Sequence, residues 1–116
     1  PFFMPRVYLE NYEMELKKAL NFFPKEPHAI FTSVSFLSDE LFKLWAAEKA
    51  CGGVKLIIGQ HGGNMGIARI SQPLEHQIKI ADTFVSWGWK EADKKNISVL
   101  PSLNLSLLTM ADTNDR

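Results

Sequence analysis

The sequence predicts an α/β fold in three layers, with a mainly parallel sheet of about four strands and helices on both faces. Segments with helical periodicity alternate with short apolar segments, in the order helix, strand, helix, strand, helix, strand, turn, strand. The central apolar segment, residues 56–58 directly before Gly59, is short and rich in β-branched residues, which predicts a strand buried on both faces. Strands joined through helices form right-handed βαβ units, which give a parallel sheet.

The first helix is predicted over residues 9–23, where apolar side chains recur every three or four positions. These positions are Leu9, Tyr12, Leu16, Ala19, Leu20 and Phe23. Pro24 and Pro27 end the helix, because proline cannot continue its hydrogen-bond ladder. Residues 29–34 then predict the first strand.

The second helix is predicted to begin after Ser38, its N-cap, and to end at Gly52-Gly53. Asp39 and Glu40 fall in its first turn, where negative charge suits the helix dipole. After the central strand, Pro73 fits the first position of a third helix, because its fixed φ suits a helix start.

Two more strands complete the predicted order. Residues 83–87 predict the third strand and residues 97–100 the fourth, with one helical turn expected between them at residues 91–95. Residues 1–101 are therefore expected to form one domain, and residues 102–116 a loosely ordered tail.

Composition narrows the classes of function. Thirteen Lys and Arg balance thirteen Asp and Glu, which argues against a nucleic acid or an anionic membrane as partner. No apolar segment approaches the roughly 20 residues of a membrane span, and no signal-peptide pattern is present.

The single cysteine, Cys51, cannot form an internal disulfide, which fits a reducing, cytoplasmic location. The three histidines lack metal-ligand spacing, so neither a metal nor another cofactor is predicted.

A polar, glycine-rich turn follows the central strand at residues 59–66, Gly-Gln-His-Gly-Gly-Asn-Met-Gly. Ligands of α/β sheets bind just beyond the carboxyl ends of such strands. Glycines allow a ligand to approach the backbone, and exposed N–H groups form anion-binding nests. The turn predicts a cradle for a phosphorylated or nucleotide-linked ligand; the alternative is a tight turn whose glycines serve geometry alone. It is neither a P-loop nor a dinucleotide-binding fingerprint.

Side chains in and after this turn supply candidate chemistry. His61 is a candidate general base or phosphate contact, because histidine exchanges a proton near neutral pH; the alternative is a hydrogen bond to a neighbouring loop. Arg69 offers a fixed positive charge for phosphate. Gln60 either contacts the ligand or points into the sheet edge with a structural role.

Two further features belong to the same edge of the sheet. Glu75 and His76 are adjacent on the third predicted helix, so their side chains diverge by about 100° and only one can reach the crevice. Trp87 and Trp89 follow the third strand. One of their rings could stack on a base or a sugar, and packing in the core or at an interface is the alternative.

The candidate site is the sum of these residues. The predicted catalytic residues are His61 and Glu75, and the predicted ligand-binding residues are Gln60, Gly62, Gly63, Asn64, Gly66, Arg69 and Trp87.

Three motifs carry a resemblance to a known family. They are Gly-Gln-His-Gly-Gly-x-x-Gly at residues 59–66, Glu-His-x-Ile-x-Ile-Ala-Asp at residues 75–82 and Ser-Trp-Gly-Trp at residues 86–89. Together they resemble a family of bacterial transferases of surface-carbohydrate assembly, related to capsule-polysaccharide and CDP-glycerol glycerophosphotransferase-type proteins. The resemblance extends from about Arg6 to about Pro101. Such proteins are similar to GT-B glycosyltransferases, in which two Rossmann-like domains face a cleft.

The resemblance implies a Rossmann-like domain that forms one half of a two-domain transferase. It implies transfer of a sugar or polyol-phosphate group from a nucleotide-activated donor, in cell-surface polysaccharide assembly. By position, Gln60 to Gly63 correspond to the family's cleft-facing motif, Glu75 to its acidic residue, and Trp87 and Trp89 to its tryptophan pair. The expected partners are the donor and either a second domain of the parent chain or a second copy.

The chain departs from the family pattern in its length and after Pro101, and it opens without an initiator methionine. We therefore expect it to be part of a larger protein, with half of an active site that binds weakly and catalyses nothing alone. The alternative function is a non-catalytic ligand- or protein-binding α/β module, with Trp45, Trp87 or Trp89 in an interface.

Overall fold

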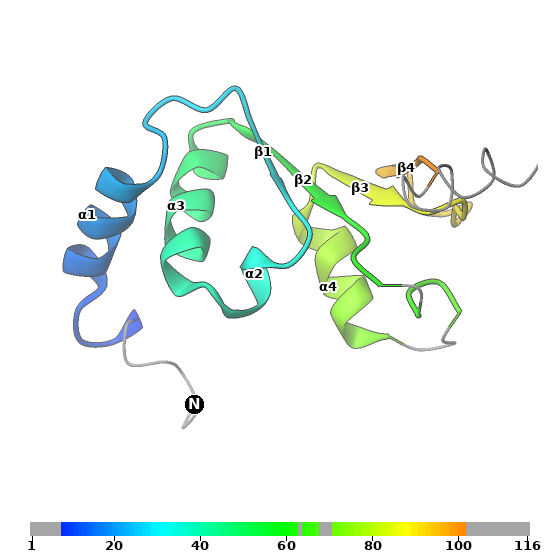
Figure 1. Cartoon of the computed structure of the whole chain (residues 1–116), viewed down its shortest axis with the longest axis horizontal. Helices are drawn as coiled ribbons and strands as arrows, with labels where there is room; N and C mark the ends of the chain where they lie inside the picture. The colour runs from blue at the N-terminus through cyan, green and yellow to red at the C-terminus, as the bar shows by residue number, and fades with distance from the viewer. Residues whose placement is uncertain (1–7, 63, 68–70, 102–116) are drawn as a thin grey trace, which may run out of the picture. The chain divides into compact units, whose positions relative to one another are not determined.

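The computed structural model describes residues 8–62, 64–67 and 71–101. The elements are α1 (Tyr12–Phe22), β1 (Ala29–Thr32), α2 (Ser35–Ser38), α3 (Glu40–Cys51), β2 (Lys55–Gly59), α4 (Gln72–Ile80), β3 (Thr83–Ser86) and β4 (Ile97–Val99) (Figure 1). The strands form one parallel sheet in the order β1-β2-β3-β4. The predicted α/β class and the predicted parallel sheet of four strands are confirmed.

Two compact units divide the chain, Pro1–Leu56 and Ile57–Arg116, so that β2 begins in the first unit and ends in the second. The expectation that residues 1–101 form one domain stays a prediction. The predicted tail, residues 102–116, lies outside the described residues.

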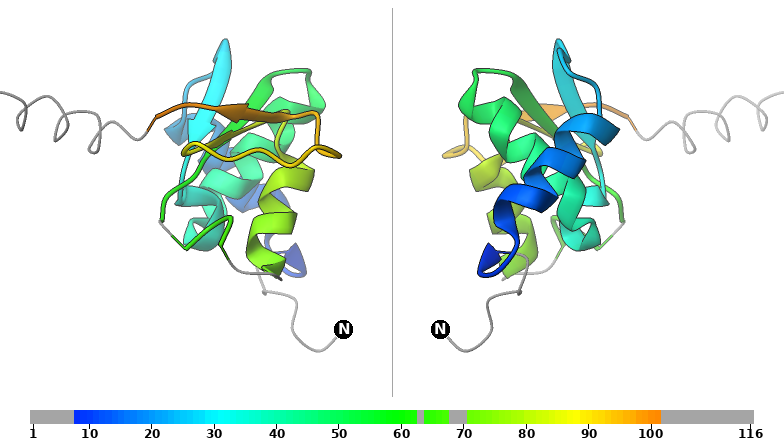
Figure 2. Two further views of the ribbon diagram at one scale, coloured as in Figure 1. Left: turned by 90° about the vertical axis from the view of Figure 1, so that its right-hand side faces the viewer. Right: turned by 90° about the vertical axis from the view of Figure 1, so that its left-hand side faces the viewer.

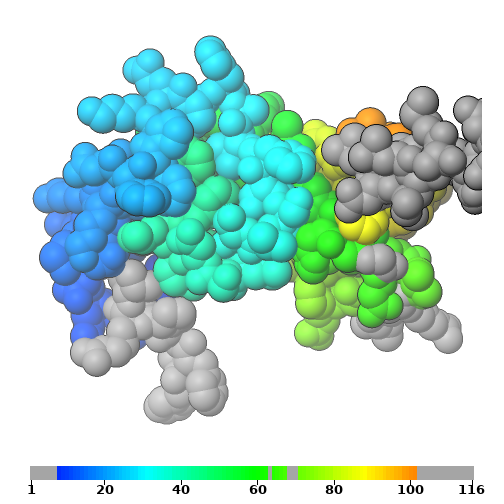
Figure 3. All heavy atoms as spheres, in the orientation of Figure 1, coloured from blue at the N-terminus to red at the C-terminus, as the bar shows by residue number. Residues whose placement is uncertain are grey.

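In the first unit, α1 lies against α3 (Figures 1 and 2), and aromatic side chains join the two helices. Phe23, directly after α1, stacks on Trp45 of α3 with ring centroids 4.9 Å apart and meets Phe42 edge-on at 5.9 Å. The Trp45 indole N–H donates to the Pro24 carbonyl at 3.0 Å, which fixes the end of α1 to α3. In Figure 3 the atoms of α1 and of the loop after it (blue to light blue) lie directly against those of α3. Trp45 is buried in this cluster and is therefore not at the surface, where the alternative function would need it.

The amino-terminal half of α1 is more exposed than its periodicity predicts. The helix begins at Tyr12 rather than at Leu9, and Ala19 is its one buried residue. Leu9 is 65% exposed and Tyr12 is 44% exposed. The aromatic contacts with α3 thus lie at the carboxyl end of α1.

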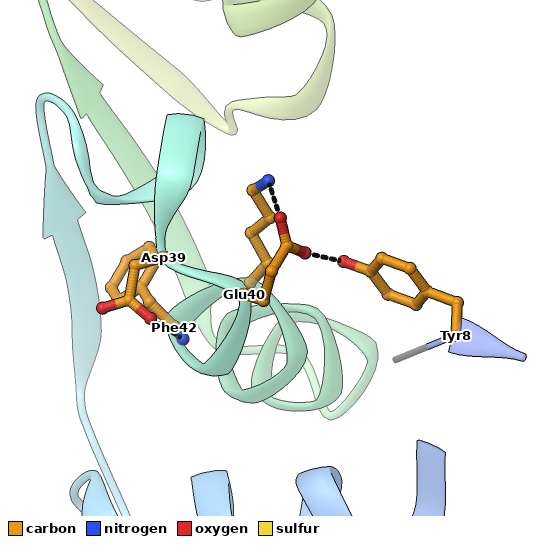
Figure 4. Close-up of polar contacts among 5 residues, drawn as sticks. Tyr8, Asp39, Glu40 and Phe42 are labelled. Atoms are coloured by element: carbon orange, nitrogen blue, oxygen red, sulfur yellow. Dashed lines mark hydrogen bonds and ion pairs between the residues drawn. The ribbon is translucent and has the colours of Figure 1, made fainter. Parts of the chain in front are cut away.

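A short helix that the sequence pattern did not predict follows β1. The strand ends at Thr32 rather than at residue 34, because the Ser35 backbone N–H donates to Thr32 Oγ1 at 3.1 Å and turns the chain. Ser38 is the last residue of α2, so its predicted role as N-cap is wrong. Asp39 is the N-cap of α3, and its carboxylate accepts the Phe42 N–H at 2.9 Å (Figure 4).

The end of α3 lies where the sequence predicts it. The Val54 N–H donates to the Lys49 carbonyl at 3.0 Å, and the Gly53 N–H donates to the Ala50 carbonyl at 2.9 Å. These two bonds form a Schellman motif, which satisfies carbonyls that the end of a helix leaves free.

A charged hydrogen-bond chain joins Tyr8 to the first turn of α3 (Figure 4). The Tyr8 hydroxyl donates to one Glu40 carboxylate oxygen at 2.6 Å, and the Lys43 ammonium donates to the other at 2.7 Å. These hydrogen bonds, that of Lys43 first, hold the pKa of Glu40 below its ordinary value. Burial, and then the hydrogen bond to Glu40, raise the pKa of Tyr8 to about 12.

In the second unit, α4 lies against β3 (Figures 1 and 2). Pro73 is the second residue of α4 rather than the first. At the other end of the helix, the Asn96 side-chain amide donates to the carbonyls of Ile78 at 2.7 Å and Ala81 at 3.0 Å. Asn96 directly precedes β4, so it attaches that strand to the carboxyl end of α4 and satisfies carbonyls there.

The segment between β3 and β4 forms turns and no helix. The Lys94 N–H donates to the Glu91 carbonyl, three residues back, at 3.3 Å. The predicted helical turn at residues 91–95 is therefore wrong, because this bond closes a β-turn that does not continue. The third and fourth strands end at Ser86 and Val99, one residue before their predicted ends.

The choice between Asp39 and Ser38 as N-cap can be tested by stability. Asp39→Ala removes the acceptor of the Phe42 N–H and is expected to lower the free energy of unfolding by about 1 kcal/mol. Ser38→Ala, the adjacent control, should change it by less than about 0.5 kcal/mol. Urea unfolding of both variants measures the difference, and a larger loss for Ser38→Ala would contradict the assignment.

The Tyr8–Glu40 contact gives stability a defined pH dependence. At neutral pH, Tyr8→Phe should cost at most about 1 kcal/mol, because solvent screens a partly exposed contact. The depressed pKa of Glu40 means that this contribution is lost as the pH falls below about 4.5, its ordinary value. The raised pKa of Tyr8 means that it is also lost as the pH rises from 10.0 to about 12.

Urea unfolding of wild type and Tyr8→Phe across this pH range checks both limits. Tyr12→Phe, which removes the hydroxyl of an exposed tyrosine, is the control at neutral pH and should change the free energy of unfolding by less than about 0.5 kcal/mol. A constant difference between wild type and Tyr8→Phe would contradict the assignment.

Candidate functional site

Two loops leave the carboxyl ends of the neighbouring strands β2 and β3 (Figure 1). The strands are parallel and pair Gly59 with Val85, so the two loops begin side by side. The Gln60 backbone N–H extends the pairing by donating to the Val85 carbonyl at 2.8 Å. The glycine loop comprises residues 60–62 and 64–67, and the tryptophan loop comprises residues 87–90.

The side chain of Gln60 links the two loops. It is only 5% exposed. Its Oε1 accepts the Trp87 backbone N–H at 2.8 Å and the Trp89 indole N–H at 2.9 Å. Its Nε2 donates to the Gly62 carbonyl at 2.7 Å and lies 3.5 Å from the Met65 carbonyl. Two donors face the oxygen and two acceptors face the nitrogen, so these contacts use the full hydrogen-bonding capacity of the amide.

This arrangement matches the structural alternative for Gln60, in which the side chain points into the sheet edge. A direct contact between that side chain and a ligand would require one of these hydrogen bonds to break. The predicted ligand-binding role of Gln60 therefore stays a prediction, and its present partners all lie within the protein.

Trp89 lies against the backbone of the glycine loop. A Cβ atom at Gly66 would come within 2.8 Å of Cε2 and Nε1 of the Trp89 ring, and Gly66 has a φ of +85°. Both facts favour glycine at this position. The same ring contacts the fully buried Phe84, with centroids 5.9 Å apart, and the Trp89 carbonyl accepts the Ser86 hydroxyl. For Trp89, the packing alternative is the one observed.

Several other predicted site residues are at the surface. The exposed ones are His61, Asn64, Gly66, Glu75 and Trp87. The Trp87 side chain is 38% exposed although its backbone N–H is held by Gln60. Gly62 is half-buried, and Gly63 and Arg69 lie outside the described residues. The roles of all of these residues stay predictions.

Glu75 lies on α4, away from either loop in sequence. The Lys94 ammonium binds Glu91 at 2.8 Å, and this hydrogen bond raises the pKa of Lys94, with the charges of Glu91, Asp93 and Glu75 adding to the effect. The Glu75 carboxylate is thus within electrostatic reach of the turn between β3 and β4.

On the same helix Gln77 is fully buried, and neither of its amide atoms has a hydrogen-bond partner within the described part of the chain.

Sequence reasoning missed the pairing of Gln60 with Trp89. The partners are 29 residues apart, and each motif alone is compatible with several arrangements. The usable signal was the placement of both motifs directly after neighbouring parallel strands, which brings their first residues together. A buried amide at one strand end then needs polar partners, and the adjacent tryptophan loop offers two N–H groups.

Metal-binding clusters and membrane-spanning helices were sought among the described residues. No three His, Cys, Asp or Glu side chains among them gather as they would to hold a metal ion. No helix in that part of the chain has both the length and the apolar character needed to cross a membrane.

Comparison with known proteins gives the class of the protein. A sequence model of the LIC12162 family transferases matches residues 1–116. The chain belongs to the LIC12162 transferase family. No match was found among curated proteins or among solved structures. Membership of the LIC12162 family confirms the transferase class that the motif resemblance predicts.

The contact between Gly66 and Trp89 predicts a graded response to alanine. Gly66→Ala should cost about 2 kcal/mol or more of unfolding free energy, because it combines an unfavourable φ with a clash against the indole. Gly88→Ala has the same kind of φ and open space, so it should cost about 1 kcal/mol. Gly62→Ala, with open space and no positive φ, should cost less than about 0.5 kcal/mol.

Thermal or urea unfolding of the three variants gives this ranking directly. Equal losses for Gly66→Ala and Gly88→Ala would show that the indole yields freely to a methyl group, contrary to the close packing described.

Proposed function

We propose that this LIC12162 family member binds the nucleotide-activated donor of a transferase that moves a sugar or polyol-phosphate group in cell-surface polysaccharide assembly. The observation that supports the proposal is the exposed His61 on a loop anchored by the buried Gln60 at the carboxyl end of a parallel strand. Ligands of α/β sheets bind at this edge. Family membership supports the transferase class, and the motif resemblance supports the class of donor.

In the proposed reaction the acceptor hydroxyl gives its proton to His61. The oxygen of the acceptor hydroxyl then bonds to the transferred group. At the same time the bond from that group to the nucleotide phosphate breaks, which leaves negative charge on the phosphate. Backbone N–H groups of Gly62, Gly63 and Gly66 cradle that phosphate. Arg69 offsets the charge, and such electrostatic stabilisation is usually the largest single contribution to catalysis of this kind.

Three exposed side chains complete the proposed site. The Trp87 ring stacks on the base or the sugar of the donor, because an aromatic face binds such rings with little loss of conformational freedom. Asn64 hydrogen-bonds to the donor from the glycine loop, and Glu75 is the second acid–base group. A second domain of the parent chain, or a second copy, faces this edge as in GT-B enzymes. The reaction takes place in the cytoplasm.

A non-catalytic module that binds a protein is the second candidate. It is favoured by large apolar side chains at the surface of the first unit, where Phe22 and Phe31 are largely exposed. Apolar side chains grouped on a surface mark interaction sites, whereas scattered ones need no such explanation.

Titration calorimetry separates the two candidates. UDP, CDP and their sugar or polyol conjugates are titrated into wild type, His61→Ala and His28→Ala, the last removing an exposed histidine of the first unit. We expect His61→Ala to weaken binding roughly tenfold or more, because it loses a charged hydrogen bond to phosphate. His28→Ala should bind as wild type does. Unchanged affinity together with unchanged turnover of the parent protein in His61→Ala would remove this residue from the site, and absence of nucleotide binding alongside binding of a protein would favour the module.

A further inference from the structure

Four hydrogen-bond contacts pass through the amide of Gln60, and each loop of the candidate site takes part in two of them. On the glycine loop the partners are the carbonyls of Gly62 and Met65. On the tryptophan loop they are the backbone N–H of Trp87 and the indole N–H of Trp89. The amide cannot turn over, because a flip would set its oxygen against two carbonyls and its N–H groups against two donors.

Packing reinforces this connection. The Trp89 ring that donates to Gln60 also lies against Gly66 of the glycine loop and against Phe84 of β3. The Trp89 carbonyl is held by the hydroxyl of the fully buried Ser86. Trp89 is therefore attached through its ring to the glycine loop and through its backbone to β3, so neither loop can shift without disturbing it.

The exposed groups of the two loops flank this connection. His61 follows Gln60 directly, and Trp87 precedes Trp89 by two residues. A ligand that contacts both loops loses less free energy on binding when the loops are already fixed with respect to each other. The buried pair therefore decides whether the exposed residues act as one surface.

We propose that Gln60 and Trp89 are positioning residues that hold the Trp87 ring and the glycine loop as one preorganised surface for a nucleoside diphosphate. The base lies on the Trp87 ring and the diphosphate on the glycine loop. Neither Gln60 nor Trp89 touches the ligand in this arrangement. The inference rests on the proposed function, because it takes a nucleoside diphosphate as the ligand.

Two substitutions remove the connection in different ways. Gln60→Met keeps the length of the side chain and removes all four polar contacts. Trp89→Phe keeps an aromatic ring against Gly66 and Phe84 and removes the indole N–H that Gln60 accepts. Trp89→Phe is the milder change and tests the hydrogen bond in a protein that keeps this packing.

The molecule offers a matched control for each. Trp45→Phe removes an indole hydrogen bond of similar length, 3.0 Å to the Pro24 carbonyl, in the first unit. Gln72→Met changes an exposed glutamine at the start of α4. These controls show what the loss of an indole bond, or the change of a glutamine, does where no connection between the loops is involved.

The main measurement is the affinity for UDP and CDP by titration calorimetry. Trp89→Phe and Gln60→Met should each weaken binding about tenfold, because a tenfold change in affinity corresponds to roughly the net free energy of one hydrogen bond. Trp45→Phe and Gln72→Met should change it by less than about twofold, because they are independent of the loops. The double variant Gln60→Met with Trp89→Phe should bind no more weakly than Gln60→Met alone, since both changes break the same connection. Wild-type affinity in Trp89→Phe, or effects that multiply in the double variant, would overturn the proposal.

Amide hydrogen exchange in the free protein separates this proposal from the proposed function. The Trp87 amide donates to Gln60, so its exchange should accelerate in Gln60→Met and stay unchanged in Gln72→Met. The Trp89 indole N–H also donates to Gln60, so its exchange should accelerate in the same variant. If wild type binds neither UDP nor CDP, the proposed function fails while these exchange rates still show whether the two loops are coupled. If it binds them and the exchange rates do not change, the coupling fails and the proposed function stands.

Discussion

The need to satisfy one buried amide organises the edge of the sheet where β2 and β3 end. Gln60 follows β2 directly, and its backbone continues the pairing to Val85. Its side chain is therefore enclosed at the sheet end, where unpaired polar atoms are costly. The groups that satisfy it come from both loops, so the conformations of the two loops depend on each other. The positive φ of Gly66 and the close approach of Trp89 to it are part of the same arrangement of the two loops around Gln60.

Sequence patterns predicted the architecture well, because its main signals are local. The apolar run before Gly59, the two prolines after α1 and the paired glycines after α3 each limit the backbone within a few residues. One error, the N-cap of α3, occurred where two adjacent residues could perform the same role. Ser38 and Asp39 are both good N-cap formers, and the bond from Ser35 to Thr32 decided between them by inserting α2. Periodicity carries no information about that competition.

The candidate site was predictable in position and less so in the orientation of its side chains. Placement after a buried strand pointed to Gln60 and His61 together, yet the structure buries the first and exposes the second. Which of two adjacent side chains turns inward depends on partners elsewhere in the chain, here Trp87 and Trp89. The same holds for the first predicted helix, because Leu9, which lies before the start of α1, and Tyr12, its first residue, stay exposed although their spacing predicts burial.

The chemical identity of residue 60 follows from its surroundings. The site presents two donors on one side and two carbonyls on the other, so it needs a planar group that accepts at one end and donates at the other. A carboxylate would accept the two N–H groups but would direct its second oxygen at the carbonyls, adding repulsion to the cost of a buried charge. An apolar side chain would leave the indole N–H and the loop carbonyls to find other partners. Glutamine meets all of these requirements without a charge, which leaves the electrostatics of this edge to exposed residues such as its neighbour His61.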